Sequence, residues 1–260
     1  MSASLEHGYL DSKGQRIAFK RYASQHNQDK PGILFLGGFK SSMAGTKATF
    51  LIDLAQKKDI SCVVFDYFGH GQSTGAFEEG TITLWLENAC TVLEQLTQGP
   101  QIIIGSSMGG WLMLLLGQLF PKRLHHLIGI ASSPGFTERL YHQRLSPDER
   151  ACLHDKGVVD VVLGGDAYMI SRTLIEDGKK HLIESPKKYA CTIDLLHGTA
   201  DNIAPWRISQ ELLSLLRCPK ASLHLLKDGD HKLTRKDELA FLEQLILNAR
   251  AKKADQITFA

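Results

Sequence analysis

An uncharged stretch from residue 102 to 121 constrains the fold of this chain more than any other feature. Three isoleucines (residues 102–104) run into the turn Gly-Ser-Ser-Met-Gly-Gly, and an almost wholly apolar segment follows. The stretch is long enough to span a membrane, but its glycines, its serines, Gln118 and Pro121 interrupt it. We therefore expect a buried strand, a tight turn and a buried helix, and no membrane span.

Similar apolar strands alternate with helical patterns along the chain. This alternation predicts an α/β fold, with a mostly parallel central sheet that has helices on both faces. The expected strands are 5–10, 15–22, 33–36, 61–66, 101–105, 127–131, 191–198 and 222–226, and the expected helices are 46–58, 82–98, 108–120, 207–217 and 236–250. Residues 251–260 are expected to form a solvated tail.

The alternation breaks between residues 132 and 190, where we predict no strand. Ser146, Pro147 and Glu149 have the spacing of a capping box at the start of one helix, and a second helix is expected after Asp166. We therefore expect a core of residues 1–131 and 191–260. A small helical cap, residues 132–190, is inserted between late strands.

Composition and charge argue against several classes of function. The chain has 260 residues, 43% of them hydrophobic, and a formal net charge of +2, so it lacks the basic field that attracts nucleic acid. Its five cysteines are scattered without a C-x-x-C pair, and no His/Asp/Glu cluster has the spacing of metal ligands. With no recognisable targeting segment at the N-terminus, we expect a soluble cytoplasmic protein with reduced thiols and no metal.

The turn after the isoleucine run matches the pattern G-x-S-x-G, from Gly105 to Gly109. A sharp turn from strand to helix holds the serine in a strained backbone conformation and exposes its hydroxyl at the carboxyl edge of the sheet. Ser107 is therefore the candidate nucleophile, and the Met108 N–H at the helix start is a candidate oxyanion donor. A bare match to the pattern is weak, but the strand before it and the helix after it strengthen it.

A serine nucleophile needs a base, and the base needs an acid that orients it. Asp201 lies in the loop after the strand 191–198, and His231 lies in the loop after the strand 222–226. The chain order Ser107, Asp201, His231 is the order that an α/β-hydrolase fold requires. All three residues should meet at the carboxyl ends of parallel strands.

The other histidines and nearby acids have structural interpretations. Asp228 and Asp230 are expected to build the turn that presents His231. His197 and His224 fall within strands and are expected to be packed or on the surface. His125 and His126 have no acid nearby in the sequence, and His70 lies in a glycine loop, so we expect these three to be structural.

The loop after the strand 33–36 supplies two glycines and then Phe39. The glycines let the backbone approach a substrate, so the Phe39 N–H is the candidate second oxyanion donor. Trp111, Phe136 and Trp206 are candidates for substrate binding, with core packing as the alternative interpretation.

These motifs together resemble the serine hydrolases of the α/β-hydrolase superfamily. The similarity is greatest to the mitochondrial abhydrolase-domain palmitoyl-protein thioesterases, which also cleave acyl glucuronides. It rests on "GTKA" (45–48), "FDYFGHGQSTG" (65–75), "GPQIIIGSSMGGWLML" (99–114), "LLHGTADNIAPW" (195–206) and "DHKL" (230–233). The resemblance implies no cofactor and the roles given above for Ser107, Asp201 and His231.

The expected function is hydrolysis of carboxylic esters or thioesters through an acyl-enzyme on Ser107. The substrate would be a small molecule or an acylated protein, with no nucleic-acid partner. Two alternatives stay open: a small-ester carboxylesterase or serine peptidase with the same triad, and a non-catalytic binding protein with this fold.

Overall fold

The structure, a computed structural model, describes residues 5–163 and 165–251. Its centre is an eight-stranded sheet in which β1 pairs antiparallel with β2 and β2 with β4, while every other neighbouring pair is parallel. In spatial order the strands are β1 (Leu5–Ser12), β2 (Gln15–Tyr22), β4 (Cys62–Phe65), β3 (Gly32–Leu36), β5 (Gln101–Ser106), β6 (Leu124–Ile130), β10 (Thr192–Gly198) and β12 (Ala221–Leu226). The predicted mostly parallel sheet is confirmed.

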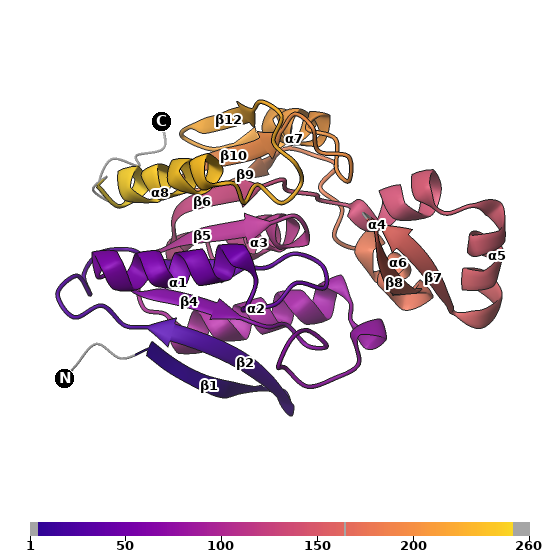
Figure 1. The fold of residues 1–260 in the computed structure, drawn as a ribbon, viewed down its shortest axis with the longest axis horizontal. Helices are drawn as coiled ribbons and strands as arrows, with labels where there is room; N and C mark the ends of the chain where they lie inside the picture. Colours follow the sequence, from indigo (N-terminus) through magenta and orange to yellow (C-terminus); the bar gives the residue numbers. More distant parts are fainter. Residues whose placement is uncertain (1–4, 164, 252–260) are drawn as a thin grey trace.

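Helices cover both faces of this sheet, which explains why β3, β4, β5 and β6 are buried along their whole length (Figure 1). Ile102 and Ile104 of β5 pack in the same cluster as residues of α1 (Thr46–Lys58) and α8 (Lys236–Ala251). Ile103, which points the other way, packs with residues of three further helices. These are α2 (Ile82–Leu96), α3 (Met108–Leu119) and α7 (Arg207–Leu215).

Most of the segment between β6 and β10 forms a separate layer beyond the end of the sheet to which the parallel strands point (Figure 1). It has its own apolar cluster, which includes Leu153, Val161, Ile170 and Ile175. Its elements are α4 (Phe136–Arg139), a π-helical turn η3 (Leu140–Arg144), α5 (Pro147–Lys156), β7 (Val158–Leu163), β8 (Asp166–Ser171) and α6 (Arg172–Lys179). Shorter elements elsewhere are η1 (Phe77–Glu79), η2 (Pro121–Arg123), β9 (Lys187–Lys188) and β11 (Leu216–Arg217).

The expectation that residues 132–190 contain no strand is wrong. β7 and β8 pair as an antiparallel hairpin, and the helix expected after Asp166 begins at Arg172, once β8 has ended. Val159 and Val161 are buried while Asp160 between them is exposed, so the two-residue period of a half-buried strand is present. The capping box is confirmed, because the Glu149 N–H donates to Ser146 Oγ and the Ser146 N–H donates to Glu149 Oε2.

Hydrogen bonds that we call the cap tethers join this layer to three loops of the sheet. They connect it to the turn after β5, to the loop after β3 and to the loop after β10. The tethers run from Ser133 N to Ser107 O (3.1 Å), from Lys40 Nζ to Ala167 O (3.1 Å) and from Arg144 Nη2 to Asn202 O (3.1 Å).

All five cysteines are free thiols; Cys62 and Cys191 are buried, and Cys90, Cys152 and Cys218 are half-buried. Within the described ranges, none of the helices has the length and apolar character needed to cross a membrane. The tail predicted for residues 251–260 lies outside the described residues, apart from Ala251.

Candidate active site

Ser107 occupies the sharp turn that the sequence predicts between β5 and α3. Its backbone has φ 54° and ψ −114°, in the left-handed half of conformational space that a residue with a side chain seldom adopts. Two hydrogen bonds to the β6 side hold this conformation: the Ser107 N–H donates to the Ile130 carbonyl (2.8 Å), and the Ser133 N–H donates to the Ser107 carbonyl (3.1 Å). The surrounding structure therefore fixes the strained serine at the carboxyl edge of the sheet.

Two glycines of the G-x-S-x-G pattern are required by close packing of the backbone. A Cβ on Gly109 would lie 2.0 Å from the Leu36 carbonyl oxygen, and a Cβ on Gly105 would lie 2.3 Å from the Gly109 carbonyl oxygen. No side chain fits at either position unless the backbone moves. The pattern therefore reflects how tightly α3 is pressed against β3 and β5.

The three side chains predicted to act together lie in one chain of hydrogen bonds. His231 Nε2 is 3.0 Å from Ser107 Oγ, and His231 Nδ1 is 2.7 Å from Asp201 Oδ2. Because an ionised carboxylate can only accept, Nδ1 carries the hydrogen, and Nε2 of the neutral imidazole accepts the serine O–H. The arrangement can remove a proton from Ser107, and the catalytic roles of the three residues stay a prediction.

Asp201 is held as a carboxylate by donors on both of its oxygens. Its side chain has no exposed surface, and Oδ1 accepts the backbone N–H groups of Ile203 (2.9 Å) and Ala204 (2.8 Å). Burial works to raise the pKa of Asp201, but hydrogen bonds from His197 and His231 and from the Ala204 N–H outweigh it and hold that pKa well below its usual range. Asp201 is therefore ionised whenever His231 could act as a base.

The fully buried His197 is a member of this network that sequence reasoning missed. Its Nε2 lies 3.0 Å from Asp201 Oδ2 and 2.8 Å from the Ala204 carbonyl oxygen, and its Nδ1 lies 2.7 Å from Ser209 Oγ. Since both partners of Nε2 are acceptors, Nε2 carries a hydrogen and donates to the carboxylate. Its position four residues before Asp201, at the carboxyl end of β10, was the available signal.

A second prediction about histidines also needs correction. His126 was expected to have no acid nearby, but its Nε2 lies 2.7 Å from Asp194 Oδ2, and His224 Nε2 lies 2.8 Å from Asp194 Oδ1. The acid stands on β10, between the two neighbouring strands that carry the histidines. Sequence distance hides this contact because parallel strands bring remote residues together.

The two backbone amides proposed as oxyanion donors lie beside Ser107. Met108 is the first residue of α3, so its N–H is one of the four that have no acceptor within the helix. A Cβ on Gly38 would be 3.5 Å from Ser107 Cβ, so the chain entering Phe39 runs alongside the serine. Their role as donors stays a prediction.

His70 supports the loop that carries Phe39, in agreement with the structural role expected for it. The Lys40 N–H donates to His70 Nε2 (3.1 Å), and His70 Nδ1 lies 3.1 Å from the Phe68 carbonyl oxygen. Burial lowers the pKa of His70 to about 4, so at neutral pH Nε2 is free of a proton and able to accept.

A cavity of about 940 Å³, which we call the Ser107 cavity, opens above these residues. Ser107 and His231 line it, together with Phe39, Phe136 and residues from the layer between β6 and β10. Phe136 is thus where a substrate-binding residue was expected. The Ser107 cavity is large enough for a substrate of drug-like size.

Two other residues predicted to bind substrate do not line the Ser107 cavity. Trp111 is fully buried, and its Nε1 donates to the His181 carbonyl oxygen (3.0 Å), because one helical turn after Ser107 the side chain points into the core. Trp206 lies outside the cavity lining, with the Arg207 guanidinium 5.3 Å from its ring centre. Core packing therefore holds for Trp111, whereas Trp206 is half-buried and a role in substrate binding stays a prediction for it.

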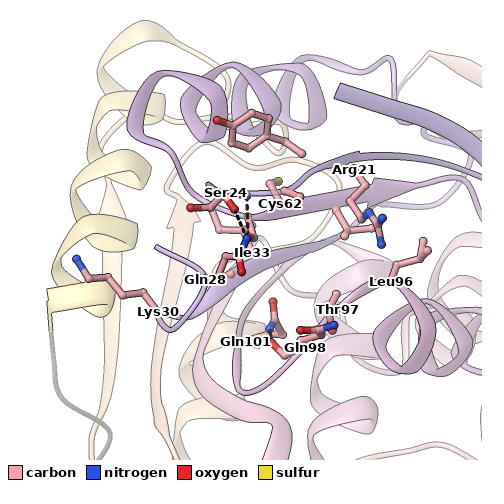
Figure 2. A pocket seen from close by; sticks show the side chains of 15 residues that line it. Arg21, Ser24, Gln28, Lys30, Ile33, Cys62, Leu96, Thr97, Gln98 and Gln101 are labelled. Carbon is pink, nitrogen blue, oxygen red and sulfur yellow. Dashed lines mark hydrogen bonds between the residues drawn. The ribbon is translucent and has the colours of Figure 1, made fainter. Parts of the chain in front are cut away.

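A second hollow, of about 250 Å³, lies at the opposite edge of the sheet. Figure 2 shows its mostly polar lining, with Ser24 and Gln28 on one side and Thr97, Gln98 and Gln101 on the other. None of its lining residues belongs to the Ser107 network. Among the residues that the structure describes, no group of three or more His, Cys, Asp or Glu side chains could hold a metal ion.

Comparison with known proteins agrees with this architecture. A family model described as "alpha/beta hydrolase fold" matches residues 31–151. The chain is 32% identical over 230 residues to the human protein "Palmitoyl-protein thioesterase ABHD10, mitochondrial". The matched region covers 87% of this chain and 74% of that protein. The mouse protein of the same name is also 32% identical, over 87% of this chain and 76% of the relative.

Solved structures of similar proteins have the same fold. The mouse alpha/beta hydrolase domain-containing protein 10 superposes with a TM-score of 0.85 at 30% identity, over 94% of this chain and 97% of that chain. A protein from Agrobacterium vitis S4 superposes with a TM-score of 0.89 at 32% identity, over 96% and 100%.

The cytoplasmic location expected from the sequence is contradicted. The relatives from human, orangutan and mouse are all described as mitochondrial. Reduced cysteines, on which the expectation partly rested, do not distinguish the cytoplasm from other reducing compartments.

Proposed function

This chain belongs to the α/β-hydrolase family and is a hydrolase, and on that premise we propose that it cleaves carboxylic esters and thioesters with Ser107, His231 and Asp201. The observation that carries the proposal is the continuous set of hydrogen bonds from Ser107 Oγ through His231 to Asp201, at 3.0 and 2.7 Å. The thioesterase names of the relatives that match most of this chain support the choice of bond.

His231 takes the Ser107 proton through Nε2 as Oγ attacks the substrate carbonyl carbon. The backbone N–H groups of Phe39 and Met108 stabilise the negative charge that develops on the carbonyl oxygen. His231 then gives its proton to the leaving oxygen or sulfur, which leaves an acyl group on Ser107. A water molecule, deprotonated by the same imidazole, then attacks the acyl carbon; the bond to Ser107 Oγ breaks, the imidazolium returns the proton to Oγ, and the carboxylic acid leaves.

Asp201 assists by holding the imidazole with its hydrogen on Nδ1 and by stabilising the imidazolium that forms in each step. The low pKa of Asp201 supports this role, since the group stays an anion and does not take the proton itself. The donors on both its oxygens also fix its orientation.

We assign residues 132–190 to a cap over a core made of residues 1–131 and 191–260. Phe136, Leu140, Leu145 and Tyr168 of this segment line the Ser107 cavity, which supports a role in accommodating the acyl chain. An apolar wall and a volume of about 940 Å³ favour an acyl chain over a short ester such as an acetate.

Hydrolysis of 4-nitrophenyl esters and N-acetylcysteamine thioesters from acetyl to palmitoyl tests the proposal. Ser107→Ala should lower kcat by roughly 10⁴- to 10⁶-fold. The matched control is the neighbouring Ser106→Ala, which should keep activity within a few-fold. A fluorophosphonate probe should add mass to the wild type and to Ser106→Ala but not to Ser107→Ala.

Near-normal turnover by Ser107→Ala would refute the proposed nucleophile. Serine-dependent turnover confined to short acyl chains would instead favour the small-ester alternative. No turnover together with no probe labelling would favour a binding protein.

A further inference from the structure

Arg139, the last residue of α4, brings a positive charge into the wall of the Ser107 cavity. Its Nη1 donates to the Pro134 carbonyl oxygen (2.8 Å), and its Nη2 donates to Ser133 Oγ (2.7 Å). The Ser133 N–H in turn donates to the Ser107 carbonyl oxygen (3.1 Å). The guanidinium is therefore linked by hydrogen bonds to the backbone of Ser107, the candidate nucleophile, through the single residue Ser133.

Among the residues that the structure describes, that charge has no carboxylate partner at ion-pair distance. In the described ranges, 5–163 and 165–251, none of the ion pairs involves Arg139. Burial lowers the pKa of Arg139, and the charge of the exposed Glu211 of α7 works in the opposite direction. The guanidinium nevertheless stays charged at neutral pH, since an arginine side chain keeps its proton in proteins. A partly buried cation with only neutral partners is costly unless an anion completes the site.

Most of the other charged side chains that line the Ser107 cavity are positive, like Arg139. Four cations line it, whereas Glu149 is the one carboxylate among the described lining side chains. Glu149 Oε2 already accepts the Ser146 N–H of the capping box. The whole chain carries only +2, so this concentration is local. The four cations are Lys47, Arg139, Arg144 and Lys232.

Arg150 of α5 shows what a purely structural arginine of the same layer looks like. Its Nη1 donates to the carbonyl oxygens of Leu145 (2.8 Å) and Tyr141 (3.3 Å), and it does not line the Ser107 cavity. Arg139 has similar neutral partners but faces the cavity. Arg150 is therefore a matched control.

We propose that Arg139 forms an anion-binding subsite, so that preferred substrates carry a carboxylate or phosphate group in addition to the scissile ester or thioester. A guanidinium presents its N–H groups in a planar fork that pairs with either anion. Arg144, Lys47 and Lys232 add attraction as the substrate enters the cavity. This inference rests on the hydrolase function proposed above.

Two matched pairs of substrates separate the possible sources of the anion. 4-Nitrophenyl hydrogen glutarate and 4-nitrophenyl valerate share a five-carbon acyl chain, and only the glutarate ends in a carboxylate. Butyryl-coenzyme A and butyryl-N-acetylcysteamine share the acyl group and the thioester, and only the coenzyme A ester carries phosphates. A wild-type preference in the first pair assigns a carboxylate, and one in the second pair assigns a phosphate.

The wild type should prefer the charged member of one pair by about tenfold or more in kcat/KM. Arg139→Met should lower kcat/KM for that substrate by about 10- to 100-fold, mainly through KM, and change the neutral member by less than about threefold. Arg139→Lys should retain part of the preference, and Arg150→Met should retain all of it.

Equal rates for both members of both pairs in the wild type would overturn the inference, even if Arg139→Met does not fold. An equal loss on charged and neutral substrates in Arg139→Met would overturn it too, because that result indicates a structural role. Ser107-dependent turnover in either case leaves the proposed hydrolase function intact.

If no substrate is turned over, the proposed function fails, and direct binding of anions then tests whether Arg139 forms the subsite. Calorimetric titration with glutarate and with inorganic phosphate should then show binding to the wild type and none to Arg139→Met. Absence of binding to the wild type, or equal binding to both proteins, would overturn the inference.

Discussion

His197 should affect the reaction although it lies too far along the network to touch a substrate. Replacing it by phenylalanine keeps a ring in the buried space but removes the donor to Asp201 Oδ2 (3.0 Å) and the contact with Ser209 Oγ (2.7 Å). Asp201 would still accept from His231, Ile203 and Ala204. The carboxylate thus stays ionised but loses one of the groups that fix its orientation.

The size of the effect follows from the loss of a hydrogen bond to a charged acceptor. Such a bond contributes about 1.5–3 kcal/mol, so the free energy of unfolding of His197→Phe should fall by about that amount. If half of about 3 kcal/mol is added to the activation free energy of the reaction, kcat/KM should fall about tenfold. A carboxylate with one donor fewer should also pair more strongly with the imidazolium of His231. The acid limb of kcat/KM should therefore move up by roughly half to one pH unit.

The assay is kcat/KM between pH 5 and 9, together with urea unfolding, for the wild type, His197→Phe and His197→Gln. Glutamine keeps an N–H donor, so it should restore much of the rate and bring the acid limb back toward its wild-type position. A loss of stability with an unchanged pH profile would refute the reasoning, because it would make His197 a core residue alone.

Two further predictions concern stability. Burial works to raise the pKa of Asp194, but hydrogen bonds from His126 and His224 hold it at about 2 against an ordinary 3.8. A depressed pKa stabilises the fold above pH 4, so about 2 kcal/mol should be lost as the pH falls from 4 to 2. A urea-midpoint difference between wild type and Asp194→Asn that stays constant over this range would contradict it. Gly109→Ala places a Cβ 2.0 Å from the Leu36 carbonyl oxygen and should cost about 3 kcal/mol or more, and an unchanged Tm would disprove this steric account.

The parts of the site that depend on strand order could be predicted from the sequence. Parallel strands end at one edge, so the loops after β5, β10 and β12 had to meet, and the side chains they carry form one hydrogen-bonded chain. Local signals were equally informative, as the capping box at Ser146 shows.

Contacts within the strands and the cap could not be predicted in the same way. Leu195 and Leu196, which directly precede His197, are buried on opposite faces of β10, so the sequence pattern does not show that this histidine turns toward Asp201. Trp111 follows the serine closely in sequence, but helical geometry points it into the core. The pairing of β7 with β8 depends on both segments, so neither segment predicts it alone. Valines on both sides of Asp160 were nevertheless a sign of a half-buried strand.

The cap tethers have a consequence for engineering. The three loops joined to this layer carry Ser107, Asp201 and the backbone that leads out of Phe39, so we expect the layer to hold these candidate residues in position as well as to enclose the substrate. Grafting a cap from a relative would therefore change turnover along with selectivity. A chimaera that keeps the donor and acceptor atoms of these bonds would separate the two effects.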